Sequence, residues 1–350
     1  MKKLIHTSIL TICFTVFCLS SMAQSEIEKI ADISPIMLER AAEFKKAIQT
    51  DGKYRSGAYI YTKRSIADYT KEPEKLAARL KILGITDVYL ACDKALSGED
   101  DNQLKWQRTF IRTAHEYGMK VHALRLSSAR LYVNNEKLYS DCKSIIDYNY
   151  SVKKTERFDG VSADLEPHIM KKGFVDYPKD FNLYWSNDNY GIGKDNDQLL
   201  KRTVEVMKIA KKELKPLTLN QAVGFFFQPR VNNGLLQHGG ADEFLKYCDN
   251  IIVMAYNFRM TRIWEMAEPI LKAAGDKTQS VSVCVKTSME TVGDEGPVTS
   301  LQPHGWNNLI KTMDFLIEKG SEYPTFRGVD IFEFQGFEKM WTKEEEPTQQ

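Results

Sequence analysis

The chain has 350 residues, of which 48 are Lys or Arg and 47 are Asp or Glu, with a mean hydropathy of −0.40. This near-balance of charge gives no electrostatic reason to expect nucleic acid or an anionic membrane as a partner. The length suffices for one large hydrophobic core, and no internal repeat, low-complexity run or linker divides it. We therefore expect a single domain.

The first 23 residues have the pattern of a secretory signal peptide. Met1-Lys2-Lys3 is basic, residues 4–19 are apolar, and small residues precede Ala23. The apolar run is short for a membrane span, and nothing later in the chain is comparably apolar. We expect cleavage near Ala23 and export to the periplasm or the cell exterior, with no membrane span. A membrane anchor is the alternative.

The cysteines beyond this segment show neither a C-x-x-C pair nor the spacing of zinc ligands. They are far apart in the sequence, and most lie in or beside apolar runs. Buried free thiols are the favoured interpretation, although an oxidising compartment would permit a disulfide. These residues are Cys92, Cys142, Cys248 and Cys284.

After an N-terminal segment (24–55) with one expected helix from about Pro35 to Ile48, short apolar runs recur through residues 56–340. A polar tail, 341–350, follows. Eight runs predict strands, at Ser56–Tyr61, Asp87–Ala91, Lys120–Leu126, Gly160–Glu166, Leu217–Gly224, Asn250–Tyr256, Ser280–Lys286 and Gly328–Phe334. Segments with helical spacing separate them, several ending at a glycine near the helix C-cap, such as Gly84, Gly118 and Gly320.

Strands that alternate with helices indicate a parallel sheet. Eight such units over this length predict a (β/α)8 TIM barrel in the α/β class. A doubly wound open sheet is the competing architecture. It loses support because Tyr61-Thr62-Lys63-Arg64, rather than a glycine-rich phosphate turn, follows the first predicted strand.

Three loops that follow predicted strands are long, at about 167–194, 225–240 and 287–305. In a barrel they lie at the C-terminal face, where active sites are found. The first of them is rich in aromatic residues, which suit stacking on sugar rings but could equally form a small core for the loop. We take Trp185 as its candidate for substrate binding.

The predicted fourth strand carries the strongest chemical signal. Side chains alternate across a strand, so Val161, Ala163 and Leu165 share one face, and Ser162, Asp164 and Glu166 share the other. Inward-facing carboxylates need pairing or solvent, which the open mouth of a barrel provides. Glu166 at the strand end, with Asp164 one layer below, has the arrangement of a general acid supported by a second carboxylate.

The sequence from Asp159 to Glu166, DGVSADLE, resembles the D-G-x-D-x-D-x-E signature of family 18 glycoside hydrolases, the chitinases and endo-β-N-acetylglucosaminidases. The resemblance implies that Glu166 is the acid/base. It also implies that Asp164 orients the substrate's N-acetyl group, whose carbonyl oxygen is the nucleophile. Such substrate-assisted hydrolysis departs from the two-carboxylate scheme.

Two further stretches resemble the same family, at the sixth and eighth predicted strands. The sequence MAYN, which ends at Asn257, is similar to the family's M-x-Y-D, which implies that Tyr256 and Asn257 hold the N-acetyl group. The stretch from Gly328 to Glu333 is similar to the eighth strand, which implies that Phe332 forms the floor of the cleavage subsite. The likeness spans residues 56–335.

The chain also departs from the family pattern. Ser162 replaces the middle Asp, which shortens the carboxylate relay, and Leu165 replaces the usual aromatic residue. Asn257 replaces Asp, and Phe332 replaces Trp. The third predicted strand lacks the family's S-x-G-G. We interpret the chain as a divergent relative.

Three alternatives stay open beside this interpretation. One is a retaining glycosidase that uses Glu166 and Glu333, although strand alternation that turns Phe332 inward turns Glu333 outward. Another is a TIM-barrel protein that binds glycan without cleaving it. The third is a metal site formed by Asp164, Glu166 and His168, which Pro167 disfavours by interrupting the strand.

Three further residues follow or lie in the first three predicted strands and can reach the same mouth: Tyr61, Asp93 and Arg125. We expect an exported glycoside hydrolase that acts on an oligosaccharide or glycan containing N-acetylhexosamine. Glu166 and Asp164 are its expected catalytic residues. The expected reaction needs no cofactor and no metal.

Overall fold

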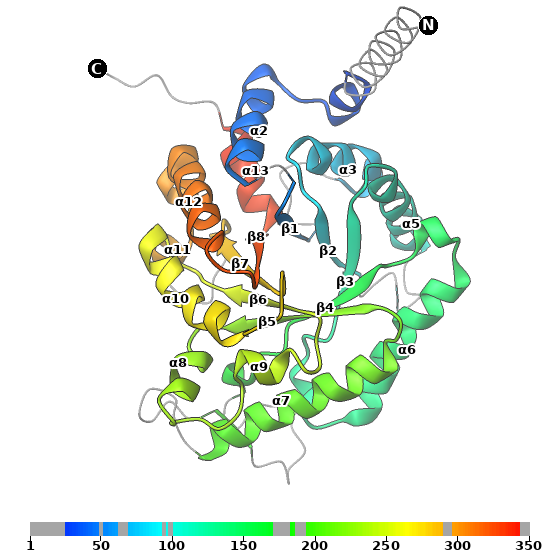
Figure 1. Cartoon of the computed structure of the whole chain (residues 1–350). Coiled ribbons are helices and arrows are strands. Elements are labelled where there is room, and N and C mark those ends of the chain that lie inside the picture. The colour runs from blue at the N-terminus through cyan, green and yellow to red at the C-terminus, as the bar shows by residue number, and fades with distance from the viewer. Residues whose placement is uncertain are drawn as a thin grey trace, which may run out of the picture.

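The computed structural model describes residues 25–48, 52–61, 69–92, 96, 101–170, 183–185, 194–289 and 296–343. Eight parallel strands close into a barrel in chain order, each hydrogen-bonded to the next and β8 to β1 (Figure 1). The strands are β1 (Arg55–Ile60), β2 (Asp87–Ala91), β3 (Lys120–Leu124), β4 (Gly160–Ala163), β5 (Thr218–Gly224), β6 (Asn250–Met254), β7 (Val281–Lys286) and β8 (Phe326–Phe332). The predicted (β/α)8 barrel is confirmed.

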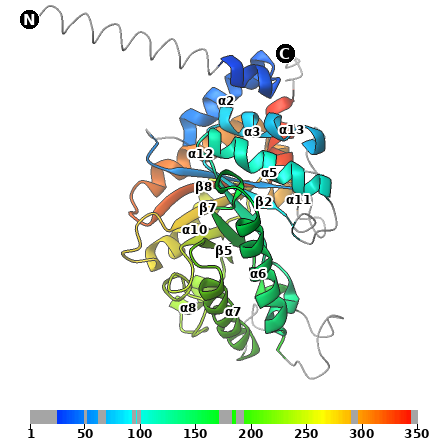
Figure 2. The same ribbon diagram turned by 90° about the vertical axis from the view of Figure 1, so that its right-hand side faces the viewer.

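Helices surround the barrel (Figure 2). They are α2 (Pro35–Ile48), α3 (Pro73–Ile82), α5 (Asp101–Glu116), α6 (Asn135–Ser151), α7 (Lys194–Glu213), α8 (Phe227–Asn232), α9 (Ala241–Phe244), α10 (Met260–Ala273), α11 (Gly296–Thr299), α12 (Gly305–Gly320) and α13 (Phe334–Thr342). Pro73 occupies the first turn of α3, where its missing N–H costs no hydrogen bond. Gly84 and Gly118, which follow α3 and α5, have φ of +76° and +80°, as expected for helix-ending glycines.

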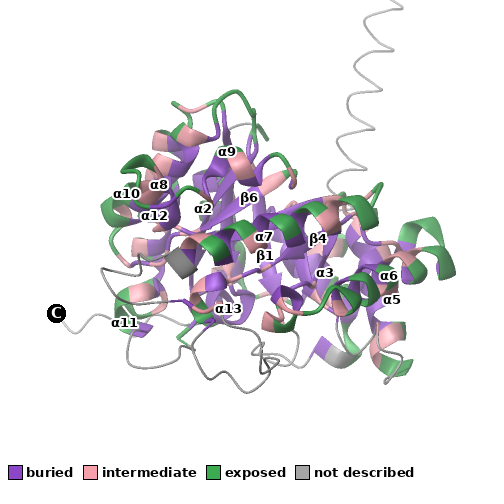
Figure 3. Cartoon of the chain, turned by 90° about the horizontal axis from the view of Figure 1, so that it is seen from below, coloured by how far each residue is buried: buried purple, intermediate pink, exposed green. Residues whose placement is uncertain are grey.

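The protein has two hydrophobic clusters, one on each face of the strands, as expected for a barrel whose strands are buried on both faces. The main cluster lies between the strands and the helices, and it includes Val161, Ala163 and Leu165 as predicted. A smaller cluster fills the barrel interior, where Tyr59 and Tyr89 pack with Leu124, Ile252 and Cys284. Figure 3 shows the buried centre and the exposed outer faces of the helices.

An ion network closes the N-terminal end of the barrel interior. Asp87 on β2 accepts hydrogen bonds from Arg55 Nε at 2.8 Å and from Arg327 Nη2 at 3.1 Å, and its Oδ1 lies 3.1 Å from His122 Nε2. Asn220 Nδ2 lies 3.2 Å from His122 Nδ1, which indicates that His122 donates from Nε2 to Asp87. Asn250 in turn donates to Asn220 Oδ1 at 2.8 Å.

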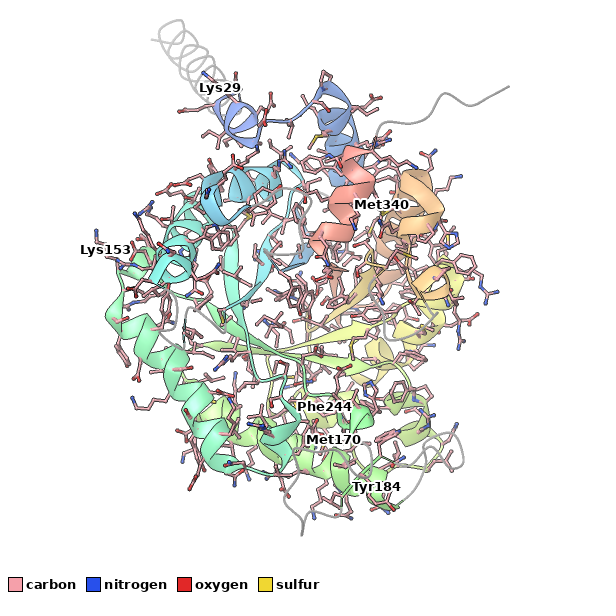
Figure 4. All side chains as sticks on the ribbon, turned by 180° about the vertical axis from the view of Figure 1, so that it is seen from behind. Lys29, Lys153, Met170, Tyr184, Phe244 and Met340 are labelled. Atoms are coloured by element: carbon pink, nitrogen blue, oxygen red, sulfur yellow. The ribbon has the colours of Figure 1, made fainter. Side chains whose placement is uncertain are left out.

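The N-terminal segment packs on the end of the barrel domain. Helix α2 lies against α12 and α13. Arg40 donates to the carbonyl oxygens of Met340 and Trp341, and Trp341 Nε1 donates to the Met37 carbonyl at 2.6 Å. Lys29 and Met340 accordingly lie toward the same end of the molecule in Figure 4. Helix α2 is therefore one of the barrel's outer helices, although the sequence placed it in a preceding segment.

Five strands end earlier than predicted at the C-terminal mouth, among them the first, at Ile60 instead of Tyr61, and the third, at Leu124 instead of Leu126. The fourth stops at Ala163 instead of Glu166, the sixth at Met254 instead of Tyr256, and the eighth at Phe332. Backbones diverge where the barrel opens, so the last residues of each apolar run leave the ladder. Pro167 adds to this effect after β4 because it has no N–H to donate.

The four cysteines beyond residue 23 are buried free thiols, as expected. In the part of the chain that the structure describes, no helix combines the length and the apolar character needed to cross a membrane. The expected signal peptide and the tail from residue 344 lie outside the described residues.

Candidate active site

The first two residues of the Asp159–Glu166 stretch build the lower part of β4. Asp159 Oδ2 accepts the backbone N–H of Val121 at 2.7 Å, and it lies 2.9 Å from His115 Nε2. A Cβ on Gly160 would lie 2.1 Å from Thr218 Oγ1 and 2.6 Å from His122 Nδ1. The glycine is therefore required by the close approach of the neighbouring strands, and both residues act in folding.

Asp164 lies one residue past β4, at the mouth of the barrel. Its backbone N–H donates to the carbonyl of Leu126 at 3.3 Å, which connects the ends of the third and fourth strands. Leu126 has φ of +62°, a left-handed conformation that is costly for a leucine and that concentrates at functional sites. The Asp164 side chain is half-buried, and its Oδ1 is buried without a hydrogen-bond partner among the described residues.

The surroundings of Asp164 favour its neutral form. Burial raises the pKa of this carboxyl to about 8, and the negative charge of Glu166 adds to the effect. Among the described residues, neither a cation nor a set of N–H donors offsets the loss of solvent, which is the pattern of a carboxyl kept protonated near neutral pH. The negative charge of Glu166 therefore acts on Asp164, although both residues lie beyond the end of β4.

Glu166 does not lie on β4, contrary to the sequence prediction. It immediately precedes a 3-10 turn, η5 (Pro167–Ile169), and its side chain is 28% exposed. Among the described residues, His168 lies beside it, with its Nε2 3.4 Å from Glu166 Oε1. Partial exposure is what a proton donor needs in order to reach a ligand in the mouth.

Tyr256 follows β6 on another wall of the mouth. Its pKa lies well above the usual range, mainly because the side chain is removed from water. Negative charge on Cys284, Tyr59, Asp164 and Glu166 would raise it further. Tyr256 thus lies close enough to both carboxyl groups for their charges to raise its pKa. The hydroxyl therefore stays protonated and is available as a hydrogen-bond donor.

Asn257 is 8% exposed, and its Oδ1 accepts the backbone N–H of Arg259 at 3.0 Å. The side-chain oxygen thus shapes the turn before α10. The remaining NH2 group is the part of this amide that can donate to a ligand.

Phe332 ends β8 at the centre of an aromatic group. Its ring stacks on Tyr256 with 5.7 Å between centroids and 25° between planes. Tyr59 and Tyr61 meet it edge-on, at 5.4 Å and 6.3 Å. The structure thus brings together three residues predicted to bind substrate, Tyr61, Tyr256 and Phe332, and these rings can form an apolar floor for a sugar.

Trp185 has a different setting. It is 7% exposed and packs beside Phe226 and Phe227, with centroid distances of 6.2 Å and 5.7 Å. This enclosure supports the alternative weighed for the loop aromatics, a small core that holds the loop after β4. Residues 171–182 and 186–193 of that loop lie outside the described residues, as does Asp93.

Other candidates lie away from the mouth or contribute little there. Arg125 pairs with Asp141 of α6 at 2.9 Å. Glu333 is fully buried just before α13, which disfavours the two-carboxylate alternative because a buried group cannot contact a sugar. Ser162 is fully buried, and its hydroxyl has no partner among the described residues. The described residues contain no cluster of three His, Cys, Asp or Glu side chains that could hold a metal.

One mouth residue was missed by the sequence argument. Lys286 ends β7, is buried, and holds its Nζ 6.0 Å from the centre of the Tyr256 ring. The signal was present, since alternation along Ser282, Cys284 and Lys286 predicts one inward face, as it does on β4.

Neither a protein-family model nor a curated protein matches the sequence of this chain. Solved structures do. The GH18 chitinase from Pseudoalteromonas aurantia superposes with a TM-score of 0.51 at 14% identity, covering 82% of this chain and 97% of that one. The spore cortex-lytic enzyme SleL from Bacillus cereus superposes with a TM-score of 0.50 at 9% identity, covering 82% and 72%.

These likenesses concern the fold. The resemblance to family 18 glycoside hydrolases is confirmed at this level. The chain is a single-domain (β/α)8 barrel similar to that of a GH18 chitinase, with a pair of coupled carboxyl groups at its C-terminal mouth.

Proposed function

We propose that this protein is a glycoside hydrolase that cleaves a glycan containing N-acetylhexosamine by substrate assistance. The observation that carries the proposal is the pair of Asp164 and Glu166 at the end of β4. Asp164 has its pKa raised to about 8, and Glu166 is partly exposed beside it. The raised pKa keeps Asp164 neutral so that it can hydrogen-bond an acetamido group, and the partial exposure of Glu166 allows it to reach the glycosidic oxygen.

In this mechanism Glu166 donates its proton to the glycosidic oxygen as the C1–O bond breaks. The acetamido carbonyl oxygen of the substrate attacks C1 and forms a cyclic intermediate. Asp164, acting as a neutral or shared-proton carboxyl, orients that acetamido group and stabilises the charge that develops on it. Water then attacks C1, its proton returns to Glu166, and the ring of the intermediate opens.

The remaining mouth residues would bind the sugar. The Tyr256 hydroxyl and the Asn257 NH2 group would donate to the acetamido oxygen. Phe332, supported by the rings of Tyr256 and Tyr61, would lie beneath the pyranose. Because the chain begins with a signal-peptide pattern, we also propose that the protein acts on glycan outside the cytoplasm.

The test compares wild type with Glu166→Gln on a panel of N-acetylglucosamine-containing oligosaccharides and N-glycans, with hydrolysis and binding both recorded. We expect turnover to fall by about 100-fold or more while binding is retained, since the amide fits the site but cannot donate the proton. Turnover that survives the substitution contradicts the mechanism. Binding without turnover in both proteins would favour the non-catalytic glycan-binding alternative.

A further inference from the structure

His168 is partly buried beside the proposed acid, with 25% of its side chain exposed. It lies in η5 and contacts three aromatic rings. We call these rings, Trp185, Phe226 and Phe227, the aromatic collar. The ring centroids lie 5.1 Å from Phe226, 6.1 Å from Phe227 and 6.4 Å from Trp185, all in edge-on or steeply tilted contact. A collar of this kind fixes the direction of the imidazole.

The two ring nitrogens of His168 have unequal surroundings. Nε2 lies 3.4 Å from Glu166 Oε1, whereas Nδ1 is buried and has no hydrogen-bond partner among the described residues. A neutral imidazole carries one donor and one acceptor, and a protonated imidazole carries two donors. A proton on Nδ1 would be a buried donor without an acceptor, which is costly. The neutral ring with its proton on Nε2 is the form that fits.

We infer that His168 is the positioning residue for Glu166: its neutral imidazole, held by the aromatic collar, directs Nε2–H at Oε1 of the Glu166 carboxyl group and hydrogen-bonds that group when it ionises. This inference rests on the proposed function. It assigns to His168 the support that the family pattern places on the middle Asp and that Ser162 cannot give, because its buried hydroxyl carries no charge.

The proton balance of the reaction is unchanged by this role. Glu166 gives its proton to the leaving oxygen and later recovers one from the attacking water. His168 keeps its Nε2 proton throughout and gains its strongest contact in the intermediate, when Glu166 is ionised. A donor that binds the charged form more strongly than the neutral form stabilises that step selectively.

The charged and titratable groups near the pair come from several elements. Asp164 precedes Glu166 on the same connection, and Tyr256 lies at the end of β6. Arg230 of α8 holds its guanidinium 5.2 Å from the Phe226 ring, on the collar itself. Lys286 of β7 holds its Nζ 6.0 Å from the centre of the Tyr256 ring.

The first test needs no turnover. Histidine side chains of the full chain are labelled with 15N, and His168 is identified by the signals lost in His168→Gln. We expect the neutral Nε2–H tautomer, and we expect its Nε2 signal to move in Glu166→Gln, where the carboxylate acceptor is gone. A proton on Nδ1, or a signal unchanged in Glu166→Gln, overturns the inference.

The second test compares His168→Phe, which keeps a ring but loses the donor, with His168→Gln, which keeps a donor. We expect kcat to fall about 10-fold in the Phe variant with KM within about twofold, and to recover largely in the Gln variant.

The matched control is His238→Phe. His238 Nδ1 lies 2.9 Å from Glu243 Oε1 in the segment before α9, so it forms a similar pair outside the proposed machinery. We expect no change in kcat or in KM. Equal kinetics of wild type and His168→Phe overturn the inference. Absence of turnover in wild type counts against the proposed function, and the tautomer measurement then decides the role of His168 alone.

Discussion

Each end of the barrel interior holds an aspartate with a shifted pKa, and the two shifts have opposite directions. At the N-terminal end, burial alone would raise the pKa of Asp87. The hydrogen bond from His122 and the charges of Arg327, His122 and Arg55 outweigh burial and hold the pKa well below its usual range. At the C-terminal mouth, burial and the charge of Glu166 raise the pKa of Asp164 to about 8.

The difference shows how one fold separates stability from chemistry. Asp87 is surrounded by donors from β1, β3 and β8, so its charge fastens strands that are distant in sequence. Asp164 has an oxygen without a partner among the described residues and a carboxylate as its neighbour. A carboxyl group that must exchange protons with a substrate needs an oxygen that is free of hydrogen-bond partners within the protein. Groups with shifted pKa values concentrate at functional sites.

The largest expected effect on stability comes from Asp87→Asn. The substitution leaves Arg55, Arg327 and His122 facing a neutral group, and breaking such a buried ion network costs about 3–5 kcal/mol of unfolding free energy. Urea denaturation at neutral pH measures it. The stability that Asp87 contributes is present above its unfolded pKa of about 3.9 and is lost as pH falls below that value, so the acid limb of the stability profile should flatten in the variant.

A suitable control for Asp87→Asn is Asp147→Asn, which breaks an exposed pair with Lys143 on α6. Such surface pairs contribute about 0.5 kcal/mol or less. Equal losses in the two variants would mean that the network at the closed end of the barrel is no stronger than a surface ion pair.

Asp164→Asn should increase the unfolding free energy, whereas Asp87→Asn decreases it. Because its pKa is raised to about 8 in the folded protein, Asp164 favours folding least at high pH. Its contribution declines from the unfolded pKa of about 3.9 upward and levels off above pH 8. We expect Asp164→Asn to be more stable than wild type by about 1–3 kcal/mol at pH 8 and by less at pH 5, with reduced turnover. Denaturation at both pH values measures this, and a constant difference would contradict the raised pKa.

The smallest expected effect is that of Ser162→Ala. The Ser162 hydroxyl is buried without a partner among the described residues, so its removal deletes an unsatisfied group and one small atom. We expect the unfolding free energy to change by less than about 1 kcal/mol, in either direction. A loss as large as that of Asp87→Asn would show that this hydroxyl holds a contact that unites the end of β4 with its neighbours.

Much of the fold followed from local patterns. The alternation of Val161, Ala163 and Leu165 with Ser162 predicted which residues pack under the helices, and the main hydrophobic cluster contains the three apolar ones. Strand ends at the mouth were predicted too long, because apolar character continues where pairing stops. Glu166 therefore lies before a 3-10 turn, off the strand, and this position brings His168 to its side.

The ion network at the N-terminal end of the barrel could not be predicted from the sequence. Asp87, His122 and Arg327 are widely separated in the chain, and nothing near any of them indicates its partners. The setting of Trp185 was equally hidden, since its enclosure depends on Phe226 and Phe227 from the connection after β5.

The sequence by itself determined the order of strands and helices, the inward placement of Asp164 and the likeness to family 18, since each depends on residue periodicity or on a short motif. Only the tertiary structure decided which aspartate is held charged and which is kept neutral. The pKa of a carboxyl depends on the donors and charges that surround it in space, and barrel closure brings these from strands far apart in the chain.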